Sequence, residues 1–366
     1  MSKKRIVVKI GSSSLTNDQG EIDQIKFQDH IEALSELRKR NHEVILVSSG
    51  AVAAGFKRLG YPARPLTTKG KQAAAAVGQG LLIESYIEKF SDFGIVPAQL
   101  LLTRNDFSNR EQYRNAFATV EELLERGILP IINENDTVAV EELTFGDNDM
   151  LSALVSGFIH ADQLIILTDV NGLYDSNPNQ NPHAKRLDYI EEITEEMFDG
   201  ARGTGSKVGT GGMKSKLLAA QTALSLGVPV FIGKGEGKEK LVNILAGQGD
   251  GTYIRGKSLD WVNTNRQWIG YHSEIKGKLY IDQGAEEAIL YKGRSLLPAG
   301  VFKVQGVFQT GDVVEVYGQN GVIGKGAVSF SSKHLHEMLQ DRLINQENNG
   351  PTREIIHRDR WVPLIQ

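Results

Sequence analysis

The chain has 366 residues and a mass of 40.2 kDa, a length typical of a protein with two domains. Hydrophobic residues make up 40% and charged residues 23%, with a net charge of −4, which excludes disordered and fibrous classes and argues against a general nucleic-acid coat. Because the chain contains no cysteine, disulfides, thiolate zinc sites and cysteine nucleophiles are excluded, and we expect a cytoplasmic location.

In chain order, short apolar segments alternate with helical patterns over the first two thirds. The first apolar run is too short for a signal peptide, and no window reaches the ~18 apolar residues of a membrane span, so no membrane is expected. Strands are predicted at 6–10, 44–47, 95–102, 128–132, 164–167 and 228–232. Helices are predicted at 24–40, 110–126, 149–159 and 213–226. This alternation predicts an α/β fold, a three-layer αβα sandwich around a mainly parallel open sheet.

Near residue 270 the pattern changes to short strands rich in glycine, with almost no helical periodicity before 333–345. Residues 271–366 carry 11 basic and 11 acidic residues and are therefore neutral. We expect a first domain at 1–260, a linker at 261–274, a small β-rich barrel domain at 275–355 and a C-terminal tail at 356–366.

One segment matches a nucleotide-binding motif in its letters. Residues 251–258 read GTYIRGKS, but a P-loop requires a buried strand before it and a helix that opens at its lysine. Polar residues precede the segment, and Asp260 to Asn263 follow it. We interpret the match as a coincidence within a linker.

Small or polar turns follow four predicted strands, at 11–14, 48–50, 133–136 and 168–169. Ligands of parallel sheets bind beyond the carboxyl ends of the strands, so these turns are expected to share one site. Lys9 interrupts an apolar strand, where a buried ammonium is costly unless it meets an anion. The alternative is a lysine at the sheet edge that reaches water. The Gly-Ser-Ser-Ser turn after it favours a ligand, because small residues let backbone amides approach closely.

A glycine-rich segment, GTGGMKSK at 209–216, leads into the predicted helix at 213–226. Free amides and the positive dipole end of a helix suit phosphate, whereas a flexible linker is the alternative. Lys214 and Lys216 oppose that dipole, a conflict that an anionic ligand resolves. At 147–149, two aspartates flank an asparagine before another helix. One carboxylate suffices as an N-cap, so we expect the pair to orient lysines, magnesium or a substrate ammonium.

These parts predict phosphoryl transfer by positioning and charge neutralisation. An alcohol acceptor would need a general base, and the sequence offers no histidine with a carboxylate beside a nucleophile. A carboxylate acceptor needs none, since an ordinary side-chain pKa of about 4 keeps it ionised at neutral pH. We therefore expect Lys9 and Lys216, delivered by separate turns, to meet over the terminal phosphate of a nucleotide.

The set of turns resembles the amino acid kinase family. The matching segments are KIGSS at 9–13, VSSGAV at 47–52, NEND at 133–136, FGDND at 145–149, LTDVNGLY at 167–174 and GTGGMKSK at 209–216. The combination is most similar to members that phosphorylate the side-chain carboxylate of glutamate, the first step of proline biosynthesis. Residues 276–330 resemble a PUA domain, a module that many of these members carry.

The resemblance implies a role for each matching residue. Lys9 and Lys216 would contact the transferring phosphoryl group, and Asp149 would hold both lysines. The residues implied to bind glutamate are Ser49, Asp136 and Asn148, and the free ammonium of an amino acid would give the aspartate a partner. The residues implied to bind ATP are Lys9, Thr168, Asp169, Thr210, Gly211, Gly212, Met213, Lys214, Ser215 and Lys216.

The resemblance also implies cofactors and partners. These are ATP with Mg²⁺, glutamate as the acceptor, proline as a feedback inhibitor near the glutamate site, glutamyl phosphate reductase as the recipient of the labile product, and further copies of the chain in a dimer or tetramer. Two alternatives stay open. One is a sister kinase acting on N-acetylglutamate or aspartate, and the other is RNA binding through the PUA-like domain, against which the neutral charge of 271–366 argues.

Overall fold

The computed structural model describes residues 2–17, 19–139, 148–176, 178, 181, 183–200, 212–256, 268–345 and 354–364. The chain forms two compact units, the first of Met1–Asp106 with Arg114–Trp261 and the second of Phe107–Tyr113 with Val262–Gln366. Among the helices in those ranges, none combines the length and the apolar character that crossing a membrane demands.

The first unit is built on an eight-stranded sheet. The strands of this part of the chain are β1 (Arg5–Ile10), β2 (Glu43–Ser48), β3 (Pro97–Leu102), β4 (Leu129–Glu134), β5 (Gln163–Leu167), β6 (Leu173–Tyr174), β7 (Arg186–Leu187), β8 (Tyr189–Ile190), β9 (Val230–Lys234) and β10 (Asp250–Ile254). The order across the sheet is β3-β4-β2-β1-β5-β9-β10-β8. Its pairs are parallel except β9 with β10, so β10 and β8 run opposite to the other strands, and β6 and β7 form a separate ribbon. The mainly parallel sheet predicted from the alternating pattern is thus confirmed.

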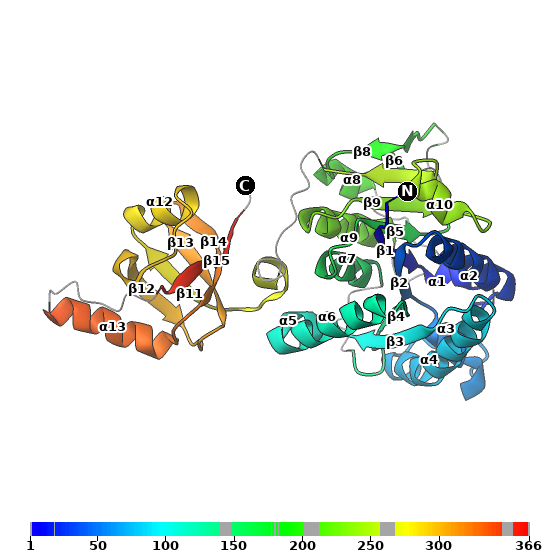
Figure 1. The fold of residues 1–366 in the computed structure, drawn as a ribbon, viewed down its shortest axis with the longest axis horizontal. Helices are drawn as coiled ribbons and strands as arrows, with labels where there is room; N and C mark the ends of the chain where they lie inside the picture. The colour runs from blue at the N-terminus through cyan, green and yellow to red at the C-terminus, as the bar shows by residue number, and fades with distance from the viewer. Residues whose placement is uncertain are drawn as a thin grey trace. The chain divides into compact units, whose positions relative to one another are not determined.

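Helices cover both faces of this sheet and make it the middle layer of three. The helices in this part of the chain are α1 (Ser12–Leu15), α2 (Gln24–Lys39), α3 (Ala51–Gly55), η1 (Lys57–Leu59), α4 (Thr68–Ser91), α5 (Arg104–Ser108), α6 (Arg110–Glu125), α7 (Asn148–Phe158), α8 (Glu195–Gly200), α9 (Met213–Ser225) and α10 (Lys240–Leu245). Helices α7 and α9 lie on one side of the sheet, and α2, α4 and α10 lie on the other (Figure 1). Side chains of β1 and β2 such as Val8 and Leu46 are fully buried between these layers.

The carboxyl ends of the central strands meet at one edge of the sheet. Ile10 of β1 is level with Ser48 of β2 and with Leu167 of β5, and Leu167 is level with Gly233 of β9. The turns that follow these strands therefore begin side by side, which is where parallel sheets place their ligands.

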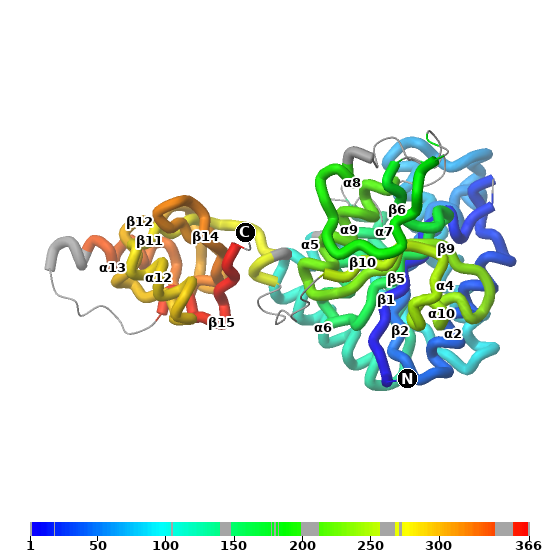
Figure 2. Tube along the Cα trace, turned by 90° about the horizontal axis from the view of Figure 1, so that it is seen from above, coloured from blue at the N-terminus to red at the C-terminus, as the bar shows by residue number. Residues whose placement is uncertain are grey.

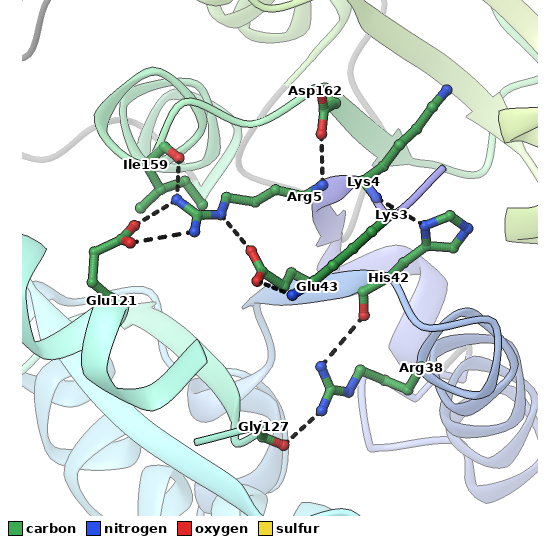
Figure 3. A network of polar contacts seen from close by, with 10 residues as sticks. All are labelled: Lys3, Lys4, Arg5, Arg38, His42, Glu43, Glu121, Gly127, Ile159 and Asp162. Atoms are coloured by element: carbon green, nitrogen blue, oxygen red, sulfur yellow. Dashed lines mark hydrogen bonds and ion pairs between the residues drawn. The ribbon is translucent and has the colours of Figure 1, made fainter. Parts of the chain in front are cut away.

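The opposite edge of the sheet is held by ion pairs around Arg5, at the amino end of β1 (Figure 3). Its guanidinium lies 2.8 Å from a carboxylate oxygen of Glu43, pairs with Glu121 of α6 and donates to the carbonyl of Ile159, just beyond α7. Partial burial opposes the charge, but the bonds to Glu43 and Glu121 outweigh it and raise the pKa of Arg5. The network fixes the C-terminal end of α7, whose other end enters the site.

Helix α4 is the largest element that the sequence pattern does not predict. It is rich in alanine and glycine, so its apolar stripe gives a weak periodic signal. It packs on α3 at backbone contact, because a Cβ on Gly78 would lie 1.8 Å from the carbonyl oxygen of Ala51, and one on Gly55 would lie 2.0 Å from that of Ala74. Only glycine at both positions permits this approach.

The second unit carries a five-stranded sheet. Its elements are η2 (Trp268–His272), β11 (Ile275–Ile281), α12 (Gln283–Tyr291), η3 (Pro298–Gly300), β12 (Val301–Gly306), β13 (Val313–Gly318), β14 (Gly321–Val328), α13 (Ser332–Asn345) and β15 (Ile356–Pro363). The strand order is β12-β11-β13-β14-β15. Figure 2 shows this part of the chain in yellow to red, with β11, β12, β14 and β15 labelled. Its core includes Leu279, Val316, Leu335 and Trp361, all nearly or fully buried. A separate β-rich C-terminal region is therefore confirmed.

Besides α4, helix α12 differs from the expectation of almost no helical periodicity before 333–345, and two segments that were not predicted as strands also differ. Residues 251–254 belong to β10, where they pair with β9, so the P-loop look-alike begins in a strand rather than in a linker. The expected tail at 356–366 contains β15, which pairs antiparallel with β14 and buries Trp361. Both segments alternate too weakly to be read as strands alone, and neighbouring strands stabilise them.

Candidate active site

Two lysines from distant parts of the chain contact one carboxylate. Lys9, the fifth residue of β1, pairs with Oδ1 of Asp149, and Lys216 of α9 donates to Oδ2 with 3.0 Å between the atoms. Asp149 is fully buried, and the lysines are 3% and 7% exposed. The three side chains that were expected to meet therefore do meet, at the carboxyl ends of the strands.

The electrostatics of this cluster favour an anion. Burial alone would raise the pKa of the Asp149 carboxyl, but the charges and hydrogen bonds of Lys9 and Lys216 outweigh burial and lower it. Asp149 is thus ionised and pairs with both ammonium groups. The two ammonium groups, held at low exposure, have the sign that a phosphoryl group requires.

Local sequence explains how the cluster forms. A Cβ at Gly11 would lie 3.3 Å from Nζ of Lys9, so glycine leaves room for the ammonium to turn toward Asp149. Asp149 lies in the first turn of α7, where the positive end of the helix dipole also favours a carboxylate.

Helix α9 also supplies a second hydrogen-bond donor to the Asp149 carboxylate, the hydroxyl of Ser215. The Ser215 hydroxyl lies 3.0 Å from Oδ2 of Asp149 and 2.9 Å from the carbonyl oxygen of Gly212, which caps the helix without a side chain. Met213 is half-buried, whereas Lys214 is exposed and takes no part in the lysine–carboxylate cluster. Thr210 and Gly211 lie outside the described residues.

A second cluster surrounds the amide of Asn148, the residue before Asp149. Its Nδ2 lies 2.8 Å from the carbonyl of Ser48, 2.9 Å from the Ser49 hydroxyl and 2.9 Å from Oδ1 of Asn133. These partners lie at the carboxyl ends of β2 and β4, so one side chain joins two strand ends to α7. Ser49 and Asn148, both expected at the acceptor site, are brought into direct contact.

Asp136 lies on the loop after β4 and faces Arg64, which stands before α4. Burial raises the pKa of the Asp136 carboxyl, and the charge of Arg64 offsets part of that rise. Burial likewise lowers the pKa of Arg64, and Asp136 opposes it. An arginine and a carboxylate therefore share this end of the sheet, where Asp136 alone was expected.

Thr168 and Asp169 follow β5 directly. The Thr168 amide donates to the carbonyl of Gly233 at 3.0 Å, and its hydroxyl donates to the Asp169 carboxylate at 3.0 Å. Thr168 is buried and Asp169 is exposed, which places them at the rim next to the ends of β5 and β9.

Several polar partners were not assigned a role from sequence. Asn133 stands in a quoted motif, and its place after a buried strand was the available signal. Nothing in the sequence pattern pointed to Gln79 or Tyr86. Both lie on α4, a helix that the pattern did not predict, and both form hydrogen bonds to residues far away in the chain. Arg64 was likewise missed.

Comparison with known proteins agrees with this geometry. Residues 4–234 match the model of the amino acid kinase family, and residues 277–348 match that of the PUA domain. The chain belongs to the amino acid kinase family. It is 64% identical to Glutamate 5-kinase 1 of Bacillus licheniformis over 100% of both chains, and 64% identical to Glutamate 5-kinase 1 of Bacillus subtilis over 99% of both.

More distant matches support the same fold. Glutamate 5-kinase of Oceanobacillus iheyensis is 58% identical, over 100% of this chain and 98% of its own. Among solved structures, carbamate kinase from Giardia lamblia bound to AMP-PNP has a TM-score of 0.50 and 19% identity, over 70% of this chain and 99% of its own. The two alternatives, a sister acid kinase and an RNA-binding protein, are not favoured by the full-length relatives.

Proposed function

We propose that this chain transfers the γ-phosphoryl group of ATP to the side-chain carboxylate of L-glutamate and so forms L-glutamyl 5-phosphate, the first step of proline biosynthesis. The observation that carries the proposal is the buried Lys9–Asp149–Lys216 cluster beside the Asn148 amide. A site for a transferring phosphoryl group and a site for an acid substrate thus adjoin on α7. The full-length likeness to curated glutamate 5-kinases supplies the identity of the acid.

In the reaction, an oxygen of the glutamate carboxylate attacks the γ-phosphorus, a bond between that oxygen and phosphorus forms, and the bond from the γ-phosphorus to the bridging oxygen of the β-phosphate breaks, leaving ADP. No proton has to be removed, since the carboxylate is ionised at neutral pH. Lys9 and Lys216 approach from two sides and neutralise charge that builds up on the phosphoryl oxygens. Asp149 keeps the two ammonium groups close together before ATP arrives.

The substrates divide between the two clusters. Glutamate binds to Ser49, Asn148 and Asp136, with its ammonium toward the Asp136 carboxylate. The residues assigned to ATP are Lys9, Thr168, Asp169, Thr210, Gly211, Gly212, Met213, Lys214, Ser215 and Lys216. The buried or half-buried position of Gly212, Met213 and Thr168 near the cluster supports this division.

Mg²⁺ belongs to the proposal as the companion of ATP. When bound, it supplies positive charge to the phosphate oxygens. Within the ranges that the structure describes, no three histidine or acidic side chains gather as a metal site, and the carboxylate nearest the phosphoryl position is taken by two lysines. We therefore assign no protein ligand to the ion and derive no step through it.

Four further expectations accompany this function. Proline, which shares the α-carboxylate and ammonium of glutamate, competes for the acceptor site as a feedback inhibitor. The chain forms a dimer or tetramer, supported by the exposed apolar side chains Val77 and Ile87 on α4 and Leu101 on the edge strand β3. The labile product passes to glutamyl phosphate reductase, and the enzyme works in the cytoplasm.

The test is formation of an acyl phosphate that hydroxylamine traps as a hydroxamate. The assay compares glutamate, N-acetylglutamate and aspartate, each with and without ATP. Of the three acids, we expect only glutamate to give product, and only with ATP, because N-acetylglutamate lacks the free ammonium that is proposed to bind Asp136. Product with N-acetylglutamate or aspartate in place of glutamate would assign the chain to a sister activity.

A further inference from the structure

Helix α4 carries a stripe of three polar side chains that reach into the acceptor half of the site. They stand at positions 72, 79 and 86, seven residues apart, and thus on one face of the helix. Gln72 lies 3.3 Å from the carbonyl of Ala139, and the Tyr86 hydroxyl lies 2.8 Å from that of Ser48. The first contact is to the loop after β4, and the second is to the last residue of β2.

The middle residue of the stripe, Gln79, begins a relay of amides. Its Oε1 accepts from Nδ2 of Asn133 at 2.8 Å, so the Asn133 oxygen points the other way. That oxygen accepts from Nδ2 of Asn148 and from the Glu134 amide, each at 2.9 Å. Because an amide donates only through nitrogen, the acceptor on Gln79 and the Glu134 backbone amide favour the same orientation of Asn133, and the Asn133 oxygen and the Ser48 carbonyl favour the same orientation of Asn148.

In this set of hydrogen bonds, the side-chain amide of Asn148 has one defined orientation. Its two N–H groups are directed at three acceptors, on Ser48, Ser49 and Asn133. Its oxygen receives the Glu134 amide at a long 3.4 Å and has a second lone pair to offer. In this orientation Asn148 presents an acceptor, which is what the ammonium of an amino acid requires.

We propose that Gln79 is a positioning residue for the acid substrate, which supports the amide orientation of Asn148 through Asn133 without touching the substrate itself. The proposal rests on the assignment of Asn148 to glutamate binding. It predicts an effect on glutamate that is separate from ATP, because the relay does not reach the Lys9–Asp149–Lys216 cluster.

The test replaces Gln79 by methionine, which keeps the length of the side chain but has no acceptor, and by lysine, which offers only donors. The lysine ammonium attracts the oxygen of Asn133, so the Asn133 side chain turns over. Nδ2 of Asn133 then faces Nδ2 of Asn148, and two donors meet. We expect the KM for glutamate to rise about 5-fold in Gln79→Met, the equivalent of one lost hydrogen bond, and more in Gln79→Lys. The KM for ATP should stay within about twofold.

Binding is measured directly by the shift of Tm that each ligand produces. Glutamate should stabilise Gln79→Met less than the parent chain, whereas AMP-PNP should stabilise both equally. The matched control is Gln221→Met at an exposed position of α9, which should leave both shifts unchanged. Equal glutamate shifts in Gln79→Met and Gln221→Met would overturn the proposal.

A third variant keeps the test valid if methionine impairs folding. Gln79→Glu retains an acceptor of the same length and so keeps Asn133 in place. Its added charge repels glutamate, and we expect its raised KM to recover toward the parent value in high salt, where methionine shows no recovery. A salt-independent rise in Gln79→Glu would contradict the relay.

Failure of the assignment on which the proposal rests is recognised separately. Asn148→Ala should raise the KM for glutamate by more than Gln79→Met does. If Asn148→Ala leaves that KM unchanged, the acceptor site itself is misplaced. If Asn148→Ala raises it and both Gln79→Met and Gln79→Lys do not, Gln79 has no positioning role and the acceptor site stands.

Discussion

Lys216 donates to the carboxylate of Asp149 over 3.0 Å, and both side chains are buried. The pair joins the first turn of α9 to the first turn of α7, with Lys9 on the other carboxylate oxygen. A buried ion pair adds little stability by itself, since removal from water offsets the attraction. Its value here is geometric, because it places two cations where one anion can reach both.

Replacement of Lys216 by methionine is expected to lower kcat by on the order of 100-fold or more, with little change in the KM for glutamate. The charge is needed most in the transition state, when the phosphoryl group is between donor and acceptor. Steady-state kinetics with both substrates varied provide the measurement. Lys214→Met, at an exposed position of the same turn, should mainly raise the KM for ATP. Equal losses of kcat in the two variants would contradict the assignment.

Replacement of Asp149 by asparagine should destabilise the chain by about 3–5 kcal/mol, because two buried lysines lose their counter-ion. The amide keeps the shape of the side chain, so the effect reports charge. An added anion should replace part of the lost charge. We therefore expect AMP-PNP to raise the Tm of Asp149→Asn more than that of the parent chain, and an equal or smaller rise would argue against this balance of charges.

Two glycines of α4 should respond in opposite directions to the same substitution. Gly78→Ala places a methyl group 1.8 Å from the Ala51 carbonyl oxygen and should cost at least about 3 kcal/mol of folding free energy. Gly80→Ala meets no atom within 4 Å and should add about 0.5–1 kcal/mol, because alanine favours a helix over glycine. Urea denaturation of both variants provides the comparison, and a stable Gly78→Ala would contradict the close packing of α3 on α4.

Stability should fall below neutral pH because of His30 on α2. Burial, reinforced by the charge of Lys240, lowers the pKa of His30 from 6.5 to about 4, and its Nε2 lies 3.0 Å from the carbonyl of Ser14. His30 is therefore protonated below about pH 6.5 in the unfolded chain, but only below about pH 4 in the folded chain. The contribution of the neutral His30 to the free energy of unfolding is complete well above pH 6.5, and about 2 kcal/mol of it is lost by pH 5.

His30→Gln removes this titration while keeping a donor for the Ser14 carbonyl. Its unfolding free energy should decline less steeply between pH 6.5 and pH 5 than that of the parent chain. The control is His183→Gln, at an exposed position. His42 and His160 also have lowered pKa values and stay in both proteins, so the difference isolates His30. Parallel curves for His30→Gln and the parent would contradict the prediction.

Most of the first unit could be predicted from local sequence pattern. The runs that became β1, β2 and β5 are continuous and apolar, as buried parallel strands are, and Lys9 stands out against them. The same reasoning failed for α4, whose small residues serve backbone contact with α3, and for β15, which depends on a neighbouring strand.

For the candidate site, the sequence pattern predicted where several residues lie, and the resemblance to the amino acid kinase family implied what each of them does. Turns at strand ends located Lys9, Ser49 and Thr168, because a parallel sheet brings such turns together. The contact of Lys9 with Asp149 depends on residues far apart in the sequence, and no local pattern contains it. Gln79 was out of reach for the same reason, since its bond to Asn133 is made only when α4 packs under the strand ends.

The two adjacent residues that open α7 have different tasks in the proposed mechanism, since Asn148 is assigned to the acceptor and Asp149 pairs with the two lysines. A single peptide bond separates them, so any backbone adjustment that reshapes one disturbs the other. Directed evolution toward a new acid should therefore find few tolerated changes on α7, and should accumulate them on the loops after β2 and β4, where side chains can vary while the phosphoryl chemistry stays intact.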